Sequence, residues 1–275
     1  TVGKNNNFDK NIKLLFRCDA GSFSDIGTGH VIRTLRLAEM LIFKQYLVPE
    51  QIVIMYRHEK GFEFAKELIN KNIYNFHKIQ FKKESINQEK NIILSSKSQI
   101  IIFDVLKSNK TLLVELKKRK KILIGFDEIR PNYELFDFMI FSLVKPKVIY
   151  KSFFTGFKYL NLSDNLIKKV YLRKKVKEIF ISLGGHDKRN LLPKILQAIK
   201  KHNKGLFFNF VISESDFTKM KKKINKQDLI KKNIKFYRNP KNYYELIAKS
   251  DLAIVSGGIT LFEFSSMGIP TISIP

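Results

Sequence analysis

The stretch KLLFRCDAGSFSDIGTGHVIRTLRLA, residues 13–38, decides how this chain folds. It begins with the apolar run Leu14 to Phe16, continues through a polar loop at 19–29 that contains glycines, and resumes with apolar residues at helical spacing. This order predicts a strand, a loop and a helix, which is the unit that opens an α/β domain.

The loop at 19–29 has the composition of a ligand-binding turn. Gly27 and Gly29 let the backbone turn sharply and bring its N–H groups close to a ligand. The helix that follows presents N–H groups and a partial positive charge, which favour a phosphate and disfavour a charged imidazole. His30, at the helix start, is therefore a candidate base. An ordinary turn with a solvated histidine is the alternative, because neither a Walker loop nor the three-glycine dinucleotide motif is present.

Three aspartates follow predicted strands. Asp19 comes after the first strand, Asp104 ends the apolar run at 99–104, and Asp127 follows the run at 121–126. Ligands of parallel sheets bind beyond the carboxyl ends of the strands, so we expect all three carboxylates to face one crevice with His30. There a carboxylate would orient the imidazole or bind hydroxyls and amides of a substrate. The alternative is that Asp104 and Asp127 cap the helices that follow them.

Strands and helices alternate through the rest of the chain. Further strands are predicted at 51–56, 78–81, 138–141, 177–183, 206–212, 233–237 and 252–255, and helices at 62–70, 108–120, 191–202, 215–224 and 240–248. Ser108 is the predicted N-cap of its helix. Such alternation predicts mostly parallel sheets with helices on both faces.

A second glycine turn lies near the end of the sequence. The predicted strand at 252–255 leads into Ser256, Gly257 and Gly258 and then into a helix. Free N–H groups at that helix start can hold a diphosphate without a metal. Glu263, about one turn into the helix, can accept a pair of hydrogen bonds from ribose hydroxyls. An ordinary strand–turn–helix with a solvated glutamate is the alternative.

These motifs resemble those of a known family. Three segments together resemble the amino-terminal signature of that family: Arg17-x-Asp19, Ile26-Gly-x-Gly-His30 and Arg33-x-Leu35-x-Leu37-Ala38. That signature marks the UDP-sugar hydrolases of pseudaminic acid biosynthesis and related spore-coat polysaccharide proteins. The turn GGHDKRN at 184–190 resembles the family's Gly-Gly-Thr/x-Asp-x-x-Asn turn, with His186 expected to be a solvated loop residue. The run at 251–275 resembles the nucleotide-sugar site of GT-B enzymes, including the N-acetylglucosaminyltransferase of peptidoglycan synthesis.

The resemblance implies a GT-B-like α/β fold, in which two Rossmann-like domains face each other across a cleft. It also implies metal-independent hydrolysis of a UDP-linked acetamido-deoxy-sugar, of the UDP-2,4-diacetamido-2,4,6-trideoxyhexose type, to UDP and free sugar with inversion. Such a reaction belongs to nonulosonic acid or surface polysaccharide biosynthesis. A GT-B glycosyltransferase with a UDP-sugar donor is the alternative within the same fold.

The resemblance also implies roles for particular residues. His30 matches the base that activates water, and Asp19 and Arg33 are expected to share the catalytic site, with Arg33 stabilising the leaving diphosphate. The expected substrate-binding residues are Gly27, Gly29, Asp104, Asp127, Gly185, Gly257, Gly258 and Glu263. One position departs from the family: Ser163 stands where relatives carry an arginine that is associated with the substrate, which leaves the exact sugar open.

Composition limits the location and the partners. The single cysteine, Cys18, excludes an internal disulfide, and no secretory signal or membrane-spanning apolar run is visible, so a cytoplasmic protein is expected. No metal-ligand cluster is visible, so neither a metal nor a cofactor is expected. The net charge of +26 is spread along the chain rather than clustered, so a UDP-sugar is the expected partner and nucleic acid is not. Peripheral contact with anionic lipid remains open. A non-catalytic basic module that binds nucleic acid or membrane is the alternative of another class.

The length of 275 residues is enough for two domains of ordinary size. We expect a tail or linker at 1–10, an amino-terminal domain with the histidine loop at 11–165, and a nucleotide-binding domain at 166–275. The chain begins without Met and stops after a strand, so we expect a piece of a longer protein with an incomplete second domain. Some relatives carry a sugar cytidylyltransferase ahead of this region. The sequence does not fix the oligomeric state.

Overall fold

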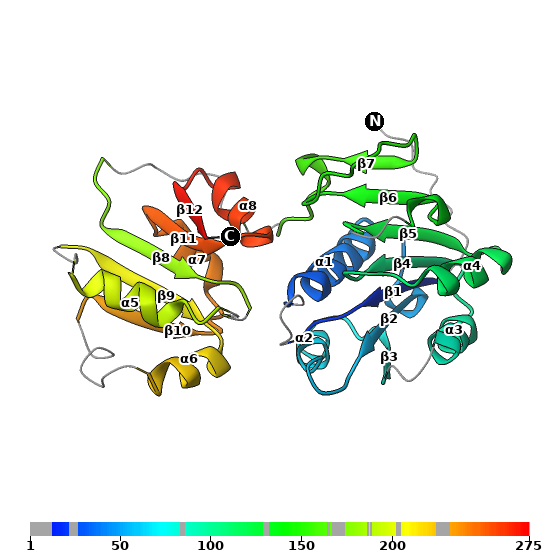
Figure 1. Ribbon diagram of the computed structural model, residues 1–275, viewed down its shortest axis with the longest axis horizontal. Coiled ribbons are helices and arrows are strands. Elements are labelled where there is room, and N and C mark those ends of the chain that lie inside the picture. The colour runs from blue at the N-terminus through cyan, green and yellow to red at the C-terminus, as the bar shows by residue number, and fades with distance from the viewer. Residues whose placement is uncertain are drawn as a thin grey trace. The chain divides into compact units, whose positions relative to one another are not determined.

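The computed structural model describes residues 13–21, 27–82, 86–128, 132–163, 166, 174–185, 187, 189–201, 205–223 and 232–274 (Figure 1). The chain divides into two compact units, Thr1–Asn161 and Leu162–Pro275, which are called unit 1 and unit 2. The predicted division after residue 165 falls shortly beyond this point. The predicted tail at 1–10, together with Ile26 and His186, lies outside the described residues.

The described part of unit 1 contains a seven-stranded sheet in the order β3-β2-β1-β4-β5-β6-β7, and every neighbouring pair is parallel. Its strands are β1 (Leu14–Cys18), β2 (Ile52–Arg57), β3 (His77–Phe81), β4 (Ile100–Asp104), β5 (Ile122–Phe126), β6 (Phe138–Phe141) and β7 (Phe153–Thr155). The chain runs outward from β1 to β3 and then returns to β4 on the other side of β1. Ligands of open parallel sheets bind at such a reversal, beyond the carboxyl ends of the strands.

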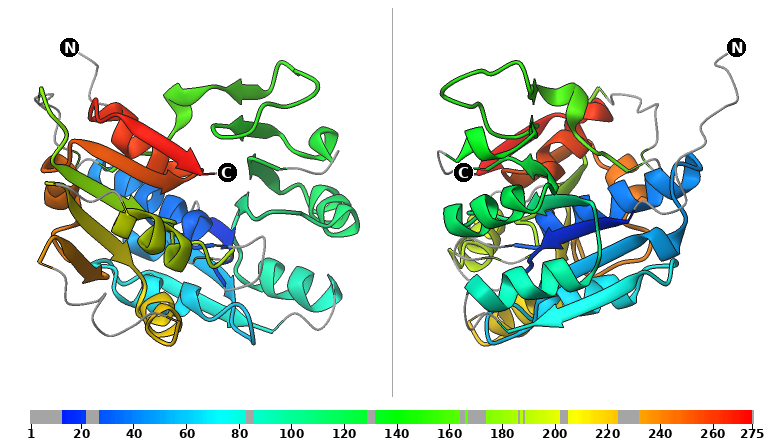
Figure 2. Two further views of the ribbon diagram at one scale, coloured as in Figure 1. Left: turned by 60° about the vertical axis from the view of Figure 1, so that its left-hand side comes forward. Right: turned by 90° about the vertical axis from the view of Figure 1, so that its right-hand side faces the viewer.

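Side chains of β1 alternate between two helical layers. Leu14, Phe16 and Cys18 pack with α1 (Gly29–Phe43) and α2 (Phe64–Asn70) in one buried cluster. Leu15 packs on the opposite face, in a cluster that includes α3 (Ile86–Ser95) and α4 (Lys110–Lys118). Figure 2 shows α3 and α4 together on one side of this sheet. Because successive residues of a strand point to opposite faces, the two layers receive different side chains from the same strand.

The described part of unit 2 contains a second parallel sheet, in the order β10-β9-β8-β11-β12. Its strands are β8 (Glu178–Ser182), β9 (Phe207–Ile212), β10 (Ile234–Arg238), β11 (Leu252–Ser256) and β12 (Thr271–Ile274). One face packs against α5 (Leu192–Lys201) and α6 (Glu214–Lys221), and the other against α7 (Tyr243–Ala248) and α8 (Ile259–Ser266). The winding reverses between β8 and β11. The predicted α/β class, with mostly parallel sheets covered by helices, is confirmed.

The structure differs from the local predictions at three places. Helix α3 and the short strand β7 were not predicted. The helix expected at 108–120 begins later, because the side chain of Asn109, not Ser108, caps it by accepting the amide of Leu112 at 3.2 Å. The amide of Ser108 instead donates to Glu128 at 2.9 Å. Among the described residues, no helix combines the length and apolar character needed to span a membrane.

Candidate active site

The candidate site of unit 1 begins with a histidine–aspartate pair. Cys18 lies opposite Asp104 in the β1–β4 register, at the point where the winding reverses, and α1 starts beyond the end of β1. His30, the second residue of α1, places its Nδ1 2.6 Å from Oδ1 of Asp104. A neutral imidazole whose proton is on Nδ1 donates to this carboxylate, which leaves Nε2 as an acceptor. The side chain of His30 is 18% exposed, whereas that of Asp104 is only 2% exposed.

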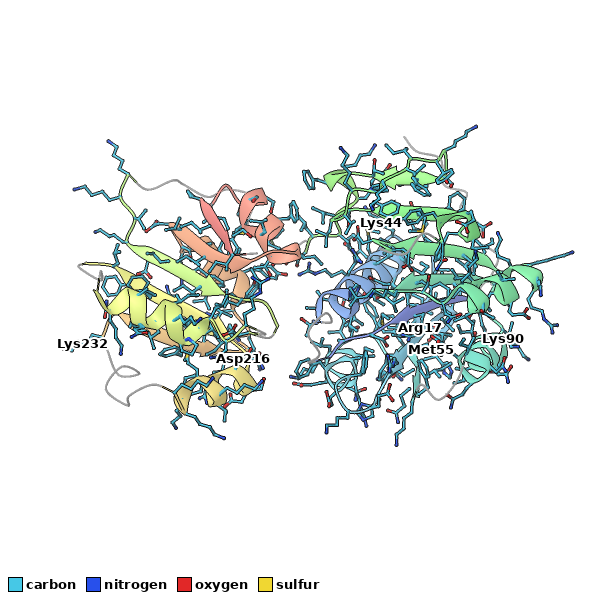
Figure 3. All side chains as sticks on the ribbon, viewed as in Figure 1. Arg17, Lys44, Met55, Lys90, Asp216 and Lys232 are labelled. Atoms are coloured by element: carbon cyan, nitrogen blue, oxygen red, sulfur yellow. The ribbon has the colours of Figure 1, made fainter. Side chains whose placement is uncertain are left out.

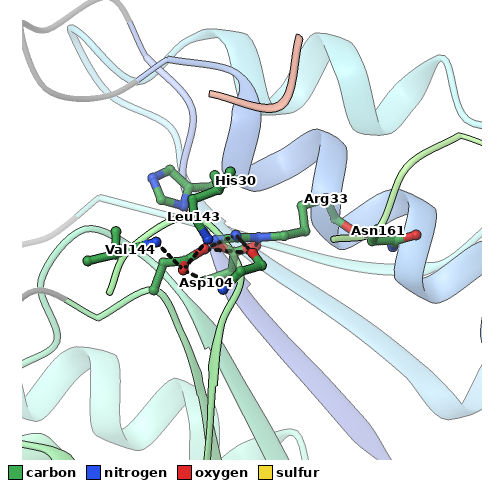
Figure 4. Close-up of polar contacts among 8 residues, drawn as sticks. His30, Arg33, Asp104, Leu143, Val144 and Asn161 are labelled. Atoms are coloured by element: carbon green, nitrogen blue, oxygen red, sulfur yellow. Dashed lines mark hydrogen bonds and ion pairs between the residues drawn. The ribbon is translucent and has the colours of Figure 1, made fainter. Parts of the chain in front are cut away.

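Arg33 fixes the orientation of the Asp104 carboxylate. It lies three residues after His30 and therefore on the same face of α1. Its Nε donates to Oδ2 of Asp104 at 2.8 Å, and a terminal nitrogen donates to Oδ1 at 2.6 Å. This two-point contact holds the carboxylate in one plane, so that Oδ1 meets the imidazole of His30 (Figure 4).

Asp127 holds the other end of Arg33. The remaining terminal nitrogen of Arg33 donates to Oδ2 of Asp127 and, at 3.3 Å, to the hydroxyl of Ser142. The Ser142 hydroxyl donates to the same carboxylate oxygen at 3.0 Å. Oδ1 of Asp127 accepts the amides of Ser142, Leu143 and Val144 at 2.9, 3.0 and 3.2 Å. Through Asp127, the turn after β6 is hydrogen-bonded to Arg33 and so belongs to the network of His30, Asp104, Arg33 and Asp127, called the His30 network.

The charges of this network stabilise one another. Burial by itself would raise the pKa of Asp104, but the Arg33 guanidinium and then His30 hold that pKa below its usual value. Burial of Arg33 opposes its charge, yet the carboxylates of Asp104 and Asp127 raise its pKa above the ordinary value. Both groups are therefore ionised near neutral pH, and Asp104 is an acceptor for the Nδ1 proton of His30.

Arg33 has a different place from the one predicted. The sequence predicts that it reaches a diphosphate, but its side chain is 4% exposed, and it donates hydrogen bonds to Asp104, Asp127 and Ser142. Arg33 thus orients the carboxylate of Asp104, which in turn contacts His30. The carboxylates of Asp104 and Asp127 are likewise engaged with protein donors, so the geometry favours orientation of the imidazole over contact with substrate hydroxyls.

Asp19 belongs to another network. Its Oδ1 accepts from Arg17 at 2.6 Å and from the amide of Arg57 at 3.0 Å. Arg17 also donates to Glu89 of α3 at 2.6 Å and lies over the ring of Phe81. Figure 3 shows Arg17 beside Met55, its partner in the β1–β2 register. The alternation of β1 explains the difference, because Arg17 and Asp19 share the face opposite that of Cys18, and His30 meets the side of Cys18.

Gly27 and Gly29 border the start of α1 without a left-handed conformation. A Cβ added at either position would meet no other atom within 4 Å. Gly29 is exposed and Gly27 is half-buried. The space beside them is open, as close approach of a ligand to the backbone requires.

The glycine turns of unit 2 lie side by side at its sheet reversal. A Cβ on Gly184, after β8, would lie 3.2 Å from the hydroxyl of Ser256, at the end of β11. Gly185 follows in the same turn and is half-buried. Gly258 has φ +99°, which favours glycine, and caps α8, while a Cβ on Gly257 or Gly258 would find open space. Backbone N–H groups at this helix start are accessible for an anion.

Glu263, on α8, is buried rather than solvated. It is 3% exposed, and its two carboxylate oxygens lie 3.4 and 3.5 Å from the hydroxyls of Tyr243 and Tyr244 of α7. The tyrosines were not predicted as part of the site. Tyr243 also packs edge-on against Phe180 of β8, which connects α7 to the middle of the sheet.

Sequence reasoning also missed Ser142. A hydroxyl directly after the predicted strand at 138–141 was the available signal, since the other candidate groups were chosen by the same rule. Within the part of the chain that the structure describes, no group of three or more His, Cys, Asp or Glu side chains has the arrangement of a metal site.

Comparison with solved structures identifies the architecture. Acinetobacter baumannii MurG matches with a TM-score of 0.64 at 12% identity, over 96% of this chain and 78% of that protein. Anabaena HepE, in complex with UDP-glucose, matches with a TM-score of 0.60 at 13% identity, over 95% of this chain and 80% of HepE. This chain has a GT-B-like fold. The fold predicted from the two glycine motifs is therefore confirmed.

Sequence comparison adds two relatives of this GT-B-like chain. The protein MJ1062 of Methanocaldococcus jannaschii is 29% identical over 269 residues, which are 90% of this chain and 53% of that protein. The spore coat polysaccharide biosynthesis protein SpsG of Bacillus subtilis is 26% identical over 262 residues, which are 89% of this chain and 72% of SpsG. The chain thus spans about half the length of the first relative. No protein-family model matches the sequence.

Proposed function

We propose that this protein is an enzyme that hydrolyses a UDP-sugar in polysaccharide or nonulosonic acid biosynthesis, with His30 as the general base. The observation that carries the proposal is the hydrogen bond from His30 Nδ1 to Asp104, at the reversal of the unit 1 sheet. It leaves the other ring nitrogen available to accept a proton. The similarity to SpsG and to a HepE structure that contains UDP-glucose supports the class of substrate.

The groups around His30 are arranged to support a general base. Asp104 stabilises the imidazolium that forms when Nε2 takes a proton, and Arg33 keeps that carboxylate from rotating. The second ring nitrogen can therefore gain a proton and lose it again in each turnover.

The proposed reaction is one displacement. Nε2 of His30 takes a proton from water while the water oxygen attacks the anomeric carbon. The bond from that carbon to the diphosphate oxygen breaks, and its electron pair leaves with UDP. The free sugar has the inverted configuration, and the imidazolium returns its proton to solvent. General-base catalysis of this kind contributes about 10²–10⁴ in rate.

The proposal assigns the nucleotide to unit 2. The N–H groups at the start of α8, beside Gly257 and Gly258, would hold the diphosphate, with the turn at Gly185 next to them. Glu263 is the predicted ribose ligand, but it is 3% exposed and contacts the hydroxyls of Tyr243 and Tyr244, so ribose would have to displace these tyrosines to reach its carboxylate. The UDP-linked diacetamido-trideoxyhexose class, which the resemblance of the histidine loop implies, is the proposed sugar.

A glycosyltransferase is the second candidate, because GT-B-like folds serve several reactions and a fold does not determine the acceptor. In that case a sugar or lipid hydroxyl would replace water, and the same His30 would take its proton. Hydrolysis is favoured by the match of residues 26–30 and 33–38 to the hydrolase signature.

The test measures UDP release from UDP-linked diacetamido-trideoxyhexoses with water as the only acceptor. His30→Asn should lower kcat by about 10²–10⁴ while calorimetry finds UDP binding unchanged. His77→Asn is the matched control, since His77 is an exposed histidine of β3. Wild-type turnover in His30→Asn would refute the assignment of the base. UDP release that requires an added hydroxyl acceptor would favour the transferase, and failure to bind UDP would refute both candidates.

A further inference from the structure

The loop between β6 and β7 presents an unusual surface. Its segment VKPKVIYK, residues 144–151 and called the 144–151 loop, combines three lysines with apolar residues and one tyrosine. Val148 is 50% exposed and Ile149 is 70% exposed. The other exposed members are Val144, Lys145, Lys147, Tyr150 and Lys151. Only Pro146 is buried within this segment, so nearly every side chain faces solvent.

The charge of this region has one sign. No aspartate or glutamate occurs from residue 138 to residue 163, although the chain contains 25 acidic residues. The lysines at 145, 147 and 151 therefore have no acidic neighbour in the sequence on either side of the loop. An anionic surface is the complementary partner.

The combination of residues distinguishes among partners. Exposed loops are ordinarily polar, so contiguous exposed aliphatic residues indicate an interaction. Lysine is depleted from protein interfaces, which disfavours a second protein. Nucleic acid would engage the lysines but would leave Val148 and Ile149 in water. An anionic bilayer surface can bind both kinds of side chain, since the aliphatic groups enter the boundary between headgroups and acyl chains while the lysine ammonium groups contact lipid phosphates.

We propose that the 144–151 loop binds the protein peripherally to anionic phospholipid membranes. The loop begins from a fixed point, because the amide of Val144 donates to Asp127 at 3.2 Å and the amide of Leu143 does so at 3.0 Å. It ends at another, since Phe153 is buried among aromatic rings of unit 1. The tip is therefore presented by the folded protein. The proposal is independent of the reaction proposed for His30.

The first test is sedimentation of the full chain with vesicles. Binding should be strong with vesicles of phosphatidylcholine and phosphatidylglycerol, weak with phosphatidylcholine alone, and reduced by salt. The double change Lys147→Glu/Lys151→Glu should weaken partitioning at least about twentyfold, from about fivefold for each lysine. Ile149→Asp should weaken it at least about tenfold.

Matched controls separate this loop from general basicity. Lys60→Glu/Lys66→Glu makes the same change in net charge at two exposed lysines elsewhere in unit 1. Ile73→Asp places the same aspartate at another highly exposed isoleucine. Both controls should retain most of the binding. Equal losses in the controls and in the loop variants would overturn the proposal, because the whole positive surface would then account for the binding.

The second test uses the absence of tryptophan from the sequence. Ile149→Trp provides one reporter whose emission should shift to the blue, and be quenched by brominated lipid, when anionic vesicles are added. An unshifted emission despite sedimentation would overturn the proposal. A blue shift that appears without lipid and depends on protein concentration would also overturn the proposal, because it would indicate that a second copy of the protein binds the loop. A shift already complete in dilute protein would indicate that another part of the chain covers the loop, and a shift with oligonucleotide but not with vesicles would indicate nucleic acid.

Discussion

Replacement of Asp104 by asparagine tests the centre of the His30 network with almost no change in volume. The carboxylate is 2% exposed and accepts three hydrogen bonds, one from His30 and two from Arg33. An asparagine in the same rotamer presents one oxygen and one NH₂ group. Whichever way it turns, the NH₂ group faces a donor, either of the imidazole or of the guanidinium.

The structure gives the size of the effect. Removing one partner of a buried ion pair costs about 3–5 kcal/mol. Arg33 keeps Asp127 as a second carboxylate, so we expect Asp104→Asn to lie near the lower end, at about 3 kcal/mol. If the amide NH₂ points to Nδ1 of His30, the imidazole proton moves to Nε2, and the proposed base loses its acceptor. Turnover should then fall by about 10²–10⁴, as for loss of the base.

The effect on stability should depend on pH in a defined direction. The pKa of Asp104 is lower in the folded protein than in the unfolded chain, so the unfolded chain binds its proton more readily. The stabilisation by Asp104 is therefore fully present above the unfolded pKa, about 4, and is lost as the pH falls through the folded pKa. Asparagine does not titrate, so the wild-type advantage should shrink as the pH falls below about 4.

Urea unfolding of the wild type and Asp104→Asn, at pH 7 and at several values from about pH 4 down to about pH 2.5, measures this difference. Glu67→Gln is the control for loss of one negative charge, because Glu67 forms an exposed ion pair with Lys71 and should contribute little. A difference between wild type and Asp104→Asn that stays constant with pH would refute the lowered pKa. Wild-type turnover in a folded Asp104→Asn protein would refute the role of the carboxylate in orienting His30.

Two further predictions concern the backbone and the thiol. Gly258→Ala should destabilise unit 2 by about 1–3 kcal/mol, since φ is +99°, whereas Gly257→Ala meets open space and should cost much less in thermal denaturation; equal costs would contradict the conformational argument. Burial, with the negative charges of Asp19 and Asp104, raises the pKa of the Cys18 thiol. A thiol reagent at pH 8 should therefore label Cys18 only after denaturant is added, and rapid labelling of the native protein would contradict its burial.

The sheets were predictable because their strands are strongly apolar. The runs that became β1, β4 and β8 are buried along nearly their whole length, so hydrophobicity alone marks them. Helix α3 was missed because its inward face is not fully apolar. Glu89 of α3 is buried to meet Arg17 of β1, and a buried ion pair weakens the periodicity that reveals a helix. Strand β7 has three residues, too few for a pattern.

The rule that ligands bind beyond the strand ends located candidate residues but not their partners. It selected Asp19 and Asp104 equally, since both follow apolar strands. Their difference lies in register, because Cys18 is opposite Asp104 and Asp19 therefore lies one residue beyond, on the other face. Register depends on how β1 and β4 align, which a single sequence does not state. The place of Arg33 was equally hidden, because its contacts come from carboxylates 71 and 94 residues away.

Two buried charge networks among the described residues of unit 1 differ in one feature that bears on the proposed catalysis. Arg17 with Asp19 and Glu89, and Arg33 with Asp104 and Asp127, both place one guanidinium between two carboxylates with side chains at most 7% exposed. By formal charge, each network therefore has one negative charge in excess. The second differs by one added group, His30, whose side chain is 18% exposed and contacts Asp104. The imidazole of His30 is therefore the group through which this network can exchange a proton with solvent, at Nε2. Because His30 and Arg33 lie on the same face of α1, the buried Arg33–Asp104 ion pair contacts a partly exposed histidine. The described contacts of the Arg17 network include no histidine of this kind.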